Sequence, residues 1–317
     1  MSYRIDPRAP LSDEVRRIGI GQIGEAIALL DAGRSKPDGG AHEVRKRFKR
    51  LRGLIRLVAA AAPDFRRQEE RRIKAIAASL SAIRDAAAAV EAIDRLVSET
   101  GERKGAEHLI ALRVALAARR DGIVGEQGAL ERTIDRAAAD LRLMEKAFES
   151  LCLPDAAGMA AELLAKGMEE TWLAARKASR KAGRKGRDRD FHRLRKSVKY
   201  HEMHLQLLSG AWPALKLRRK EAERLGERLG EMHDIPVLME AIGSGKPGTG
   251  ADRKFVRRLL QEKRRKLGAE CLDTAGKLFK AFPEEALRGV AVHYVLAALE
   301  SEPALDPIIA GQRPEAM

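Results

Sequence analysis

Two stretches of the chain, 150 residues apart, carry the same pattern of one histidine followed by three cations. The first is His42-Glu-Val-Arg-Lys-Arg-Phe-Lys49, and the second is His192-Arg-Leu-Arg-Lys-Ser-Val-Lys199. Both have the spacing H-x-x-R-K-x-x-K, and a helix with this spacing holds the three cations within about 60° of the histidine. Each copy therefore predicts a helical stripe of positive charge with an imidazole at its N-terminal end, which is chemistry suited to binding an anion.

The opposite side of both stretches is apolar in register. Val44 corresponds to Leu194, and Phe48 corresponds to Val198. A single basic helix face is most often plain solvated surface. Here the cations recur at the same helical angles in both copies, and clustered cations repel each other unless an anion screens them. We therefore expect both helices to bury their apolar side and to present the two stripes to one anionic ligand.

The composition of the whole chain agrees with an anionic partner. The 317 residues include 61 Lys and Arg against 46 Asp and Glu, which gives a net charge of +15. Aromatic residues make up only 4%, whereas proteins that read single-stranded nucleic acids rely on aromatic rings to stack the bases. This scarcity disfavours a nucleic-acid partner without excluding it.

Other features of the sequence predict a soluble protein of the cytoplasm. Cys152 and Cys271 are isolated thiols without the spacing of a metal site. The N-terminal residues contain no apolar signal segment, and no run approaches the roughly 18–20 apolar residues that a membrane span needs. We therefore expect no membrane partner.

Nothing in the sequence alternates as a β-strand does, and the dominance of Ala, Leu, Arg, Lys and Glu favours helices throughout. Apolar periodicity and turn residues predict helices over 12–32, 41–61, 64–84, 102–120, 127–150, 156–181, 189–209, 251–280 and 283–301, with a short helix after Asp85 and another that ends near 233. The predicted fold class is therefore all-α.

Two loops and two helix caps complete this prediction. Residues 181–188 are expected to form a basic, glycine-bearing loop, and residues 243–250 a second, glycine-rich loop. Asp85 and Asp234 are expected to cap the N-termini of following helices, so that Pro236 occupies the second position of its helix. The loop at 243–250 lacks the first glycine and the Ser/Thr of a P-loop, so it predicts no nucleotide site.

The repeat extends beyond the two stripes. Leu80-Ser-Ala-Ile-Arg-Asp85 matches Leu229-Gly-Glu-Met-His-Asp234 at an offset of 149. At the same offset, the third predicted helix aligns with the start of a later one, pairing Arg67, Arg71 and Lys74 with Lys216, Lys220 and Glu223. The sequence therefore predicts an internal duplication: two helical bundle subdomains, related by a pseudo-twofold axis, around one basic central cavity. These halves span 10–153 and 154–305, and 306–317 form a tail.

Other histidines and acids add no second site. His201 and His204 lie three residues apart, but His201 falls on the core side of its helix and is expected to be structural. The stripes contain no paired carboxylates of the kind that hold Mg²⁺ in phosphoryl-transfer enzymes. We therefore expect a binding protein rather than an enzyme, with no metal and no cofactor.

The double motif resembles the hallmark of the CHAD domain, the conserved histidine α-helical domain. The matching positions are His42, Arg45, Lys46, Lys49, Arg52, Arg56, His192, Arg195, Lys196 and Lys199. The segment from Leu229 to Asp234 is also similar, and the resemblance spans about residues 10–305. It implies two pseudo-symmetric helical bundles around a basic cavity that binds inorganic polyphosphate and, in some members, association with polyphosphate granules.

The chain departs from the family pattern at a few positions. Gly53 and Met203 occupy equivalent positions and would leave part of the cavity wall without charge. Glu70 stands where the second half has Arg219. Many members are fused to a triphosphate-processing domain with an E-x-E-x-K signature, which is absent here, so the chain resembles a stand-alone CHAD protein.

The resulting hypothesis is a polyphosphate-binding protein. Its expected binding residues are the ten motif positions together with Arg67, Arg71, Lys74, Lys216, Arg219 and Lys220, and phosphate or sulfate is expected to occupy the same site. Two other interpretations stay open: a nucleic-acid or general polyanion-binding protein, and an accessory of a polyphosphate-processing enzyme. Oligomeric state and preferred chain length are not determined by the sequence.

Overall fold

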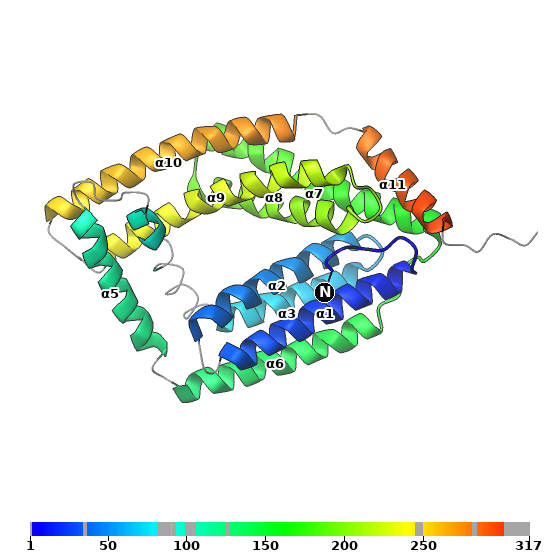
Figure 1. The fold of residues 1–317 in the computed structure, drawn as a ribbon, viewed down its shortest axis with the longest axis horizontal. Coiled ribbons are helices and arrows are strands. Elements are labelled where there is room, and N and C mark those ends of the chain that lie inside the picture. Colours follow the sequence, from blue (N-terminus) through cyan, green and yellow to red (C-terminus); the bar gives the residue numbers. More distant parts are fainter. Residues whose placement is uncertain are drawn as a thin grey trace, which may run out of the picture.

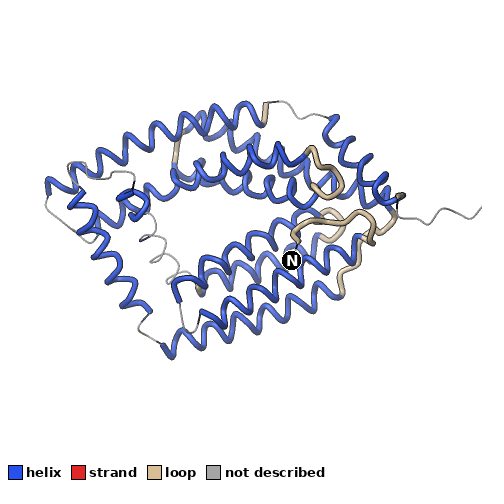
Figure 2. The backbone as a smooth tube through the Cα atoms, in the orientation of Figure 1, coloured by secondary structure: helices blue, strands red, loops and turns tan. Residues whose placement is uncertain are grey.

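The computed structural model describes residues 2–33, 37–80, 90, 93–98, 106–124, 127–244, 250–280 and 284–300. At some helix ends it describes the backbone alone, over 37–42, 106–108, 119–124, 127–130, 241–244, 250–252 and 285–286. Within these residues every regular element is a helix, as Figure 2 shows, so the all-α prediction is confirmed.

The described helices lie within five residues of most predicted bounds. In chain order they are α1 (Leu11–Gly33), α2 (Pro37–Leu57), α3 (Pro63–Ser79), α5 (Ala106–Val124), α6 (Gln127–Glu149), α7 (Ala157–Lys185), α8 (Asp188–Leu208), α9 (Leu215–Ser244), α10 (Gly250–Leu278) and α11 (Glu284–Leu299). The two predicted motif helices are α2 and α8.

The helices form two bundles that lie side by side in Figure 1. In the first bundle α1 packs on α2 and α6, while α3 packs on α2 and α6. In the second, α8 packs between α7 and α9, α10 packs on α9 and α11 packs on α7. Because α2 also contacts α7 and α8, the two motif helices lie where the bundles meet.

The apolar sides of α2 and α8 are buried, as the sequence pattern predicts. Val44 and Phe48 are 1% and 4% exposed, and Leu194 and Val198 have no exposed surface. All four belong to one continuous core. Burying a side chain of this size contributes about 1.5–3 kcal/mol, so the core fixes the rotation of each helix and turns its cationic stripe out of its own bundle.

α2 and α8 cross at uncharged positions beside α7. A Cβ on Gly53 would lie 3.0 Å from the Cβ of Met203, and a Cβ on Gly167 would lie 2.1 Å from the carbonyl oxygen of Leu57. Only a residue without a Cβ allows backbones to approach this closely. The uncharged positions Gly53 and Met203 therefore form the contact between the bundles, and the prediction that they line a cavity wall is wrong.

A buried histidine joins three helices at this crossing. Nε2 of His204 lies 2.9 Å from the carbonyl oxygen of Gly53, and its Nδ1 lies 3.1 Å from that of Gly167. Burial lowers the pKa of His204 to about 4, so the neutral ring donates to one of the two carbonyls. His201 is likewise buried, which confirms its predicted structural role.

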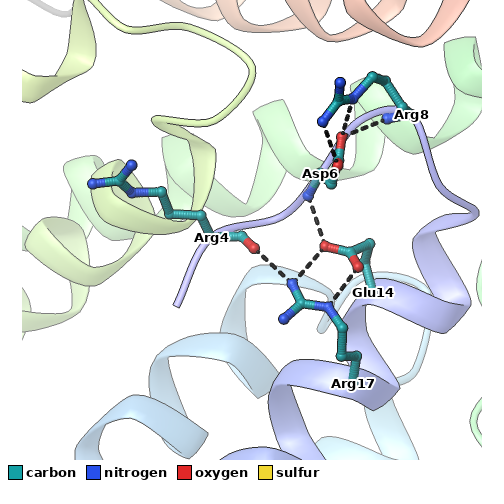
Figure 3. Close-up of polar contacts among 5 residues, drawn as sticks. All are labelled: Arg4, Asp6, Arg8, Glu14 and Arg17. Carbon is teal, nitrogen blue, oxygen red and sulfur yellow. Dashed lines mark hydrogen bonds and ion pairs between the residues drawn. The ribbon is translucent and has the colours of Figure 1, made fainter. Parts of the chain in front are cut away.

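The segment before α1 is fastened to both bundles. Figure 3 shows Arg17 donating to both carboxylate oxygens of Glu14 at 2.7 Å and to the carbonyl oxygen of Arg4 at 3.0 Å. The backbone N–H of Asp6 donates to the same carboxylate at 2.7 Å. The N–H of Ile5 donates to a carbonyl in the last turn of α8 at 2.9 Å, so this segment holds α1 and α8 in fixed relation.

Residues from the first half of the sequence also reach the second bundle. α5 and the helical residues 93–98 pack on α9 and α10 and form a smaller core. Its buried members include Ile93, Leu96, Leu109, Leu112, Ile235, Leu238, Val256 and Leu260. The predicted boundary at residue 153 falls between α6 and α7, yet the chain before it contributes to the cores of both bundles.

One predicted helix cap is wrong. α9 runs without a break from Leu215 to Ser244 with Pro236 inside it, so Asp234 caps no helix. A proline removes one backbone hydrogen bond from a helix interior. Ile235 and Leu238 are buried in the smaller core on either side of it, and this burial keeps the helix continuous.

The predicted loop over 181–188 is also wrong, because most of it is helix. α7 continues to Lys185, α8 begins at Asp188, and Gly186 reverses the chain between them with a φ of 60°. Glycine adopts this left-handed conformation without the steric cost that a Cβ brings. The predicted cap at Asp85 and most of the predicted loop at 243–250 lie outside the described residues.

Candidate anion-binding site

The two cationic stripes face each other between α2 and α8. The charges of Arg195 and Lys199 on α8 act on Lys49 of α2, as do those of Arg45 and Lys46 on its own helix. Burial, followed by the repulsion of these four cations, lowers the pKa of Lys49 to about 8. The fold therefore brings five predicted residues from the two halves of the sequence into one electrostatic cluster.

A second group of cations lies on the same two helices. The charges that act on Lys196 include Arg52 and Arg56 of α2 and Arg193 of α8, with Glu70 of α3 as the acid among them. Burial, followed by the arginines, lowers the pKa of Lys196. Three further predicted residues, Arg52, Arg56 and Lys196, are thus brought together across the two stripes.

Two glycines of α9 make room for the cations of α8. A Cβ on Gly226 would lie 2.7 Å from Cε of Lys199, and a Cβ on Gly230 would lie 3.1 Å from Nη2 of Arg195. The first of these distances is shorter than side chains tolerate, and the second is tight. Gly230 belongs to the repeated segment from Leu229 to Asp234, so a glycine of that segment lies against the guanidinium group of Arg195.

His192 lies against a second histidine that is missing from the predicted site residues. Its Nδ1 is 3.4 Å from Nδ1 of His233 on α9, and the ring centroids are 4.5 Å apart. Burial, followed by His233 and nearby cations, lowers the pKa of His192 to about 4, and burial also lowers the pKa of His233. Both rings are therefore mainly neutral at pH 7. The side chain of His42, the predicted counterpart, lies outside the described residues.

A cavity of about 810 Å³ opens along α8. Its basic lining consists of Arg56, Arg66, Arg189, His192, Arg193, Lys196 and His233, and two acids, Glu170 and Asp188, also line it. Arg66, Arg189 and Arg193 are missing from the predicted residues. The signal for the last two was the charge density of 176–199, which holds twelve Lys and Arg against two acids.

Carboxylates occupy part of both stripes. Three ion pairs join Lys46 to Glu43 at 2.5 Å, Arg56 to Glu70 at 2.6 Å and Lys199 to Glu202 at 2.8 Å. Burial raises the pKa of Glu202, although Lys199 opposes this effect. A ligand anion must compete with these three acids for their cations, so the stripes are partly neutralised before binding.

The residues predicted from the helix repeat lie apart from these groups. Arg67, Arg71, Lys74, Lys216 and Lys220 are exposed, and Arg219 is half-buried 3.6 Å from Glu223. None of them lines the cavity; α3 contributes Arg66 instead. The buried positions Glu69, Ile73 and Ile76 fix the rotation of α3, and a shift of one residue turns a side chain by about 100°. The repeat thus points to α3, but the α3 side chain that lines the cavity is the one before the predicted Arg67.

Two negative findings apply to the part of the chain that the structure describes. No three His, Cys, Asp or Glu side chains gather there as they would around a metal ion. No helix there combines the length and apolar character required to cross a bilayer.

The chain is similar to known proteins over both stripes. The model of one protein family, the CHAD domain, matches residues 22–243. Among solved structures, the chain resembles the crystal structure of the CHAD domain from the plant Ricinus communis, with a TM-score of 0.63 and 18% identity over 88% of this chain and 94% of that chain. At this identity the likeness shows a common fold. A comparison with curated proteins gives no match.

Proposed function

The chain belongs to the CHAD-domain family, and we propose that it binds inorganic polyphosphate between the stripes of α2 and α8. The environment of Lys49 is the observation that carries this proposal. This side chain is largely buried among four other cations, and its pKa falls to about 8 as a result. An anion between the helices would screen this repulsion and raise the pKa of Lys49 toward its ordinary value, so the cluster favours anion binding.

Polyphosphate suits the chemistry of these side chains. It carries roughly one negative charge per phosphate, and guanidinium forks and ammonium groups both form charge-assisted hydrogen bonds with phosphate oxygens. Arg195 and Lys199 lie on one side of this cluster, and Arg45 and Lys49 lie on the other. Binding would release counterions and weaken as salt increases, as it does for nucleic-acid backbones.

A slim, flexible chain suits the geometry better than a duplex does. α2 and α8 are in contact where Gly53 meets Met203, so the space between the stripes is closed at that end. A rigid duplex would reach only its rim. Among the described residues that line the cavity, Tyr200 is the one phenolic or indole ring, and the guanidinium group of Arg56 already lies over it, 4.5 Å from the ring centroid.

The test is a calorimetric titration with long-chain polyphosphate at two salt concentrations, with a DNA oligonucleotide of matched charge as competitor. We expect binding that weakens with salt and that DNA does not displace. Displacement by DNA at equal charge would instead identify a general polyanion-binding protein. Absence of binding at low salt would refute the proposed function.

We propose that binding occurs without turnover. Acids near the stripes are engaged with Lys46, Arg56 and Lys199. Of the two acids that line the cavity, Asp188 is held by Arg264, and Glu170 is a single carboxylate rather than the pair that would hold Mg²⁺. The check is release of phosphate from polyphosphate incubated with the purified protein, with and without Mg²⁺ or Mn²⁺. Phosphate release that increases in proportion to protein concentration would show instead that the protein processes polyphosphate.

A further inference from the structure

The corner between α7 and α8 carries a dense group of cations outside the facing stripes. Four of them, Arg184, Lys185, Arg187 and Arg189, are exposed and are here termed the corner cations. The first two lie in the last turn of α7, and the others follow the left-handed Gly186. The tight turn therefore gathers four positive charges within six residues of chain.

The acids of this corner are already engaged by other cations. Asp188 accepts hydrogen bonds from Nε and Nη2 of Arg264 on α10, at 2.9 and 2.6 Å. Asp190 is 1% exposed, and its carboxylate lies 3.8 Å from Nζ of Lys181. Within the described residues, none of the four corner cations has a carboxylate partner. Their charge is therefore available to an external anion.

The corner is continuous with the cavity along α8. Arg189 lines the cavity together with Arg193 and Lys196. These positions follow one another at intervals of four and three residues, so their side chains are neighbours on the helix surface. A path of cations thus leads from Lys196, which faces Arg52 and Arg56 of α2, outward to the exposed turn.

We propose that the corner cations bind the part of a long polyphosphate chain that leaves the space between α2 and α8. The proposal rests on the function proposed above and adds a second segment of the same ligand. Once one segment is held between the stripes, the next is at high local concentration beside the corner, so weak contacts there increase affinity without a second free binding event. Short chains that fill only the inner segment gain nothing from these contacts.

A continuous flexible chain is favoured over a separate anionic partner for two reasons. The corner cations begin where the basic lining of the cavity ends, at Arg189. A polyphosphate chain can bend around the turn at Gly186 and continue into the cavity. A membrane presents a flat anionic surface, which cannot enter the cavity. An anionic membrane is therefore the competing outcome in the experiment.

The experiment compares short and long polyphosphate on two triple variants. The corner variant combines Arg184→Gln, Lys185→Gln and Arg187→Gln and leaves the cavity-lining Arg189 intact. The control variant combines Arg136→Gln, Arg142→Gln and Lys146→Gln on exposed positions of α6, which Figure 1 draws at the opposite edge of the molecule from α10. Both variants lose three positive charges, so any general effect of net charge is equal. Circular dichroism checks that both fold.

In the wild type, we expect long chains to bind at least about tenfold more tightly than short ones per chain. The corner variant should lose most of this advantage and keep the affinity for short chains, while the control variant keeps both. The slope of log K against log salt for long chains should become shallower by about 2, from three lost contacts at roughly 0.7 each.

Four results would overturn the proposal. Equal losses in the corner and control variants would reduce the effect to net charge. An unchanged long-chain affinity in the corner variant, with loss of binding to phosphatidylserine vesicles, would assign the corner to a membrane. Wild-type protein that binds short and long chains equally well would show that no second segment exists, with polyphosphate binding itself intact. A wild type that binds neither chain would refute the proposed function as well.

Discussion

The stripes of α2 and α8 share a sequence pattern but differ in how their cations are held. On α2, Lys46 is paired with Glu43 and Arg56 with Glu70. On α8, Lys199 is paired with Glu202, whereas Arg195 and Lys196 form no ion pair within the described residues. Lys46 and Lys196 occupy the same position of the repeated motif, but Glu43 stands three residues before Lys46, where the second copy has Arg193.

For Arg56, the acid comes from the neighbouring helix. Glu70 of α3 lies against α2 and reaches both Arg56 at 2.6 Å and Arg66 at 3.7 Å. The aligned position in α9 is Arg219, which adds a cation beside α8 instead of an acid. The two copies of the motif therefore carry similar charges, but neighbouring residues make the electrostatic potential at the two stripes different. We expect α8 to contribute more to binding than α2.

The largest effect should be a loss of stability when a charge is placed on the buried apolar side that the two helices have in common. Val198→Asp on α8 and Phe48→Asp on α2 should each destabilise the fold by about 3–5 kcal/mol, because an unpaired carboxylate would be buried in the core. Urea unfolding measures this loss. Leu217→Asp, at a position that is 70% exposed, is the control and should leave the midpoint nearly unchanged. Similar midpoints for all three variants would contradict the rotation assigned to α2 and α8.

The next effect sharpens the difference between the stripes. Lys196→Gln should weaken polyphosphate binding by about tenfold, in keeping with a hydrogen bond between charged groups worth about 1.5 kcal/mol or more. Lys46→Gln removes the same charge from the equivalent position. It should cost only about two- to threefold, since Lys46 must first leave Glu43 to reach a ligand. Calorimetry on the two variants provides the comparison, and equal losses would remove the distinction between the stripes.

The sequence was sufficient to predict the helices that meet at the site and the side of each that carries charge. Val44 and Phe48 match Leu194 and Val198 in type and in burial, because apolar periodicity directly records which face a helix buries. The facing of the stripes then follows, since the uncharged Gly53 is where α2 meets α8. Local periodicity therefore predicted both the fold class and the core of the site.

What the sequence did not predict depends on contacts between distant segments. α9 continues through Pro236 because residues 93–98 and α5 cover its far end, and no local signal reveals that cover. His233 enters the site from α9 because the same helix runs beside α8. The rotation of α3, which selects Arg66 over Arg67, is likewise decided by the core. In each case a contact between distant segments determines the structure, and the local sequence pattern alone does not.

A pH dependence should distinguish Lys49 from the other cations. Burial and neighbouring charges lower the pKa of Lys49 to about 8 in the empty site, whereas a bound anion would raise it toward the ordinary lysine value near 10.4. Lys49 therefore takes up a proton on binding above about pH 8, and affinity should fall by about tenfold between pH 7 and pH 9. His192, with a pKa of about 4, is neutral over this whole range.

The control for this dependence is Lys49→Arg, which keeps its charge at all of these pH values. It should bind at pH 9 nearly as well as at pH 7. Titration in two buffers of different ionisation enthalpy measures the proton uptake directly. A wild-type affinity that stays constant from pH 7 to pH 9 would show that Lys49 remains charged in the empty site.

The smallest effect should be a gain. Glu70→Gln removes the acid that holds Arg56 and Arg66 and so makes the surroundings of α2 more like those of α8. Affinity for polyphosphate should increase by about threefold, since a partly exposed ion pair is worth about 0.2–1 kcal/mol and its loss frees a cation for the ligand. Glu149→Gln, an exposed position at the end of α6, makes the same charge change elsewhere and controls for long-range attraction. A loss of affinity in Glu70→Gln would reverse the argument, because it would mean that Glu70 orients Arg56 for the ligand rather than competing with it.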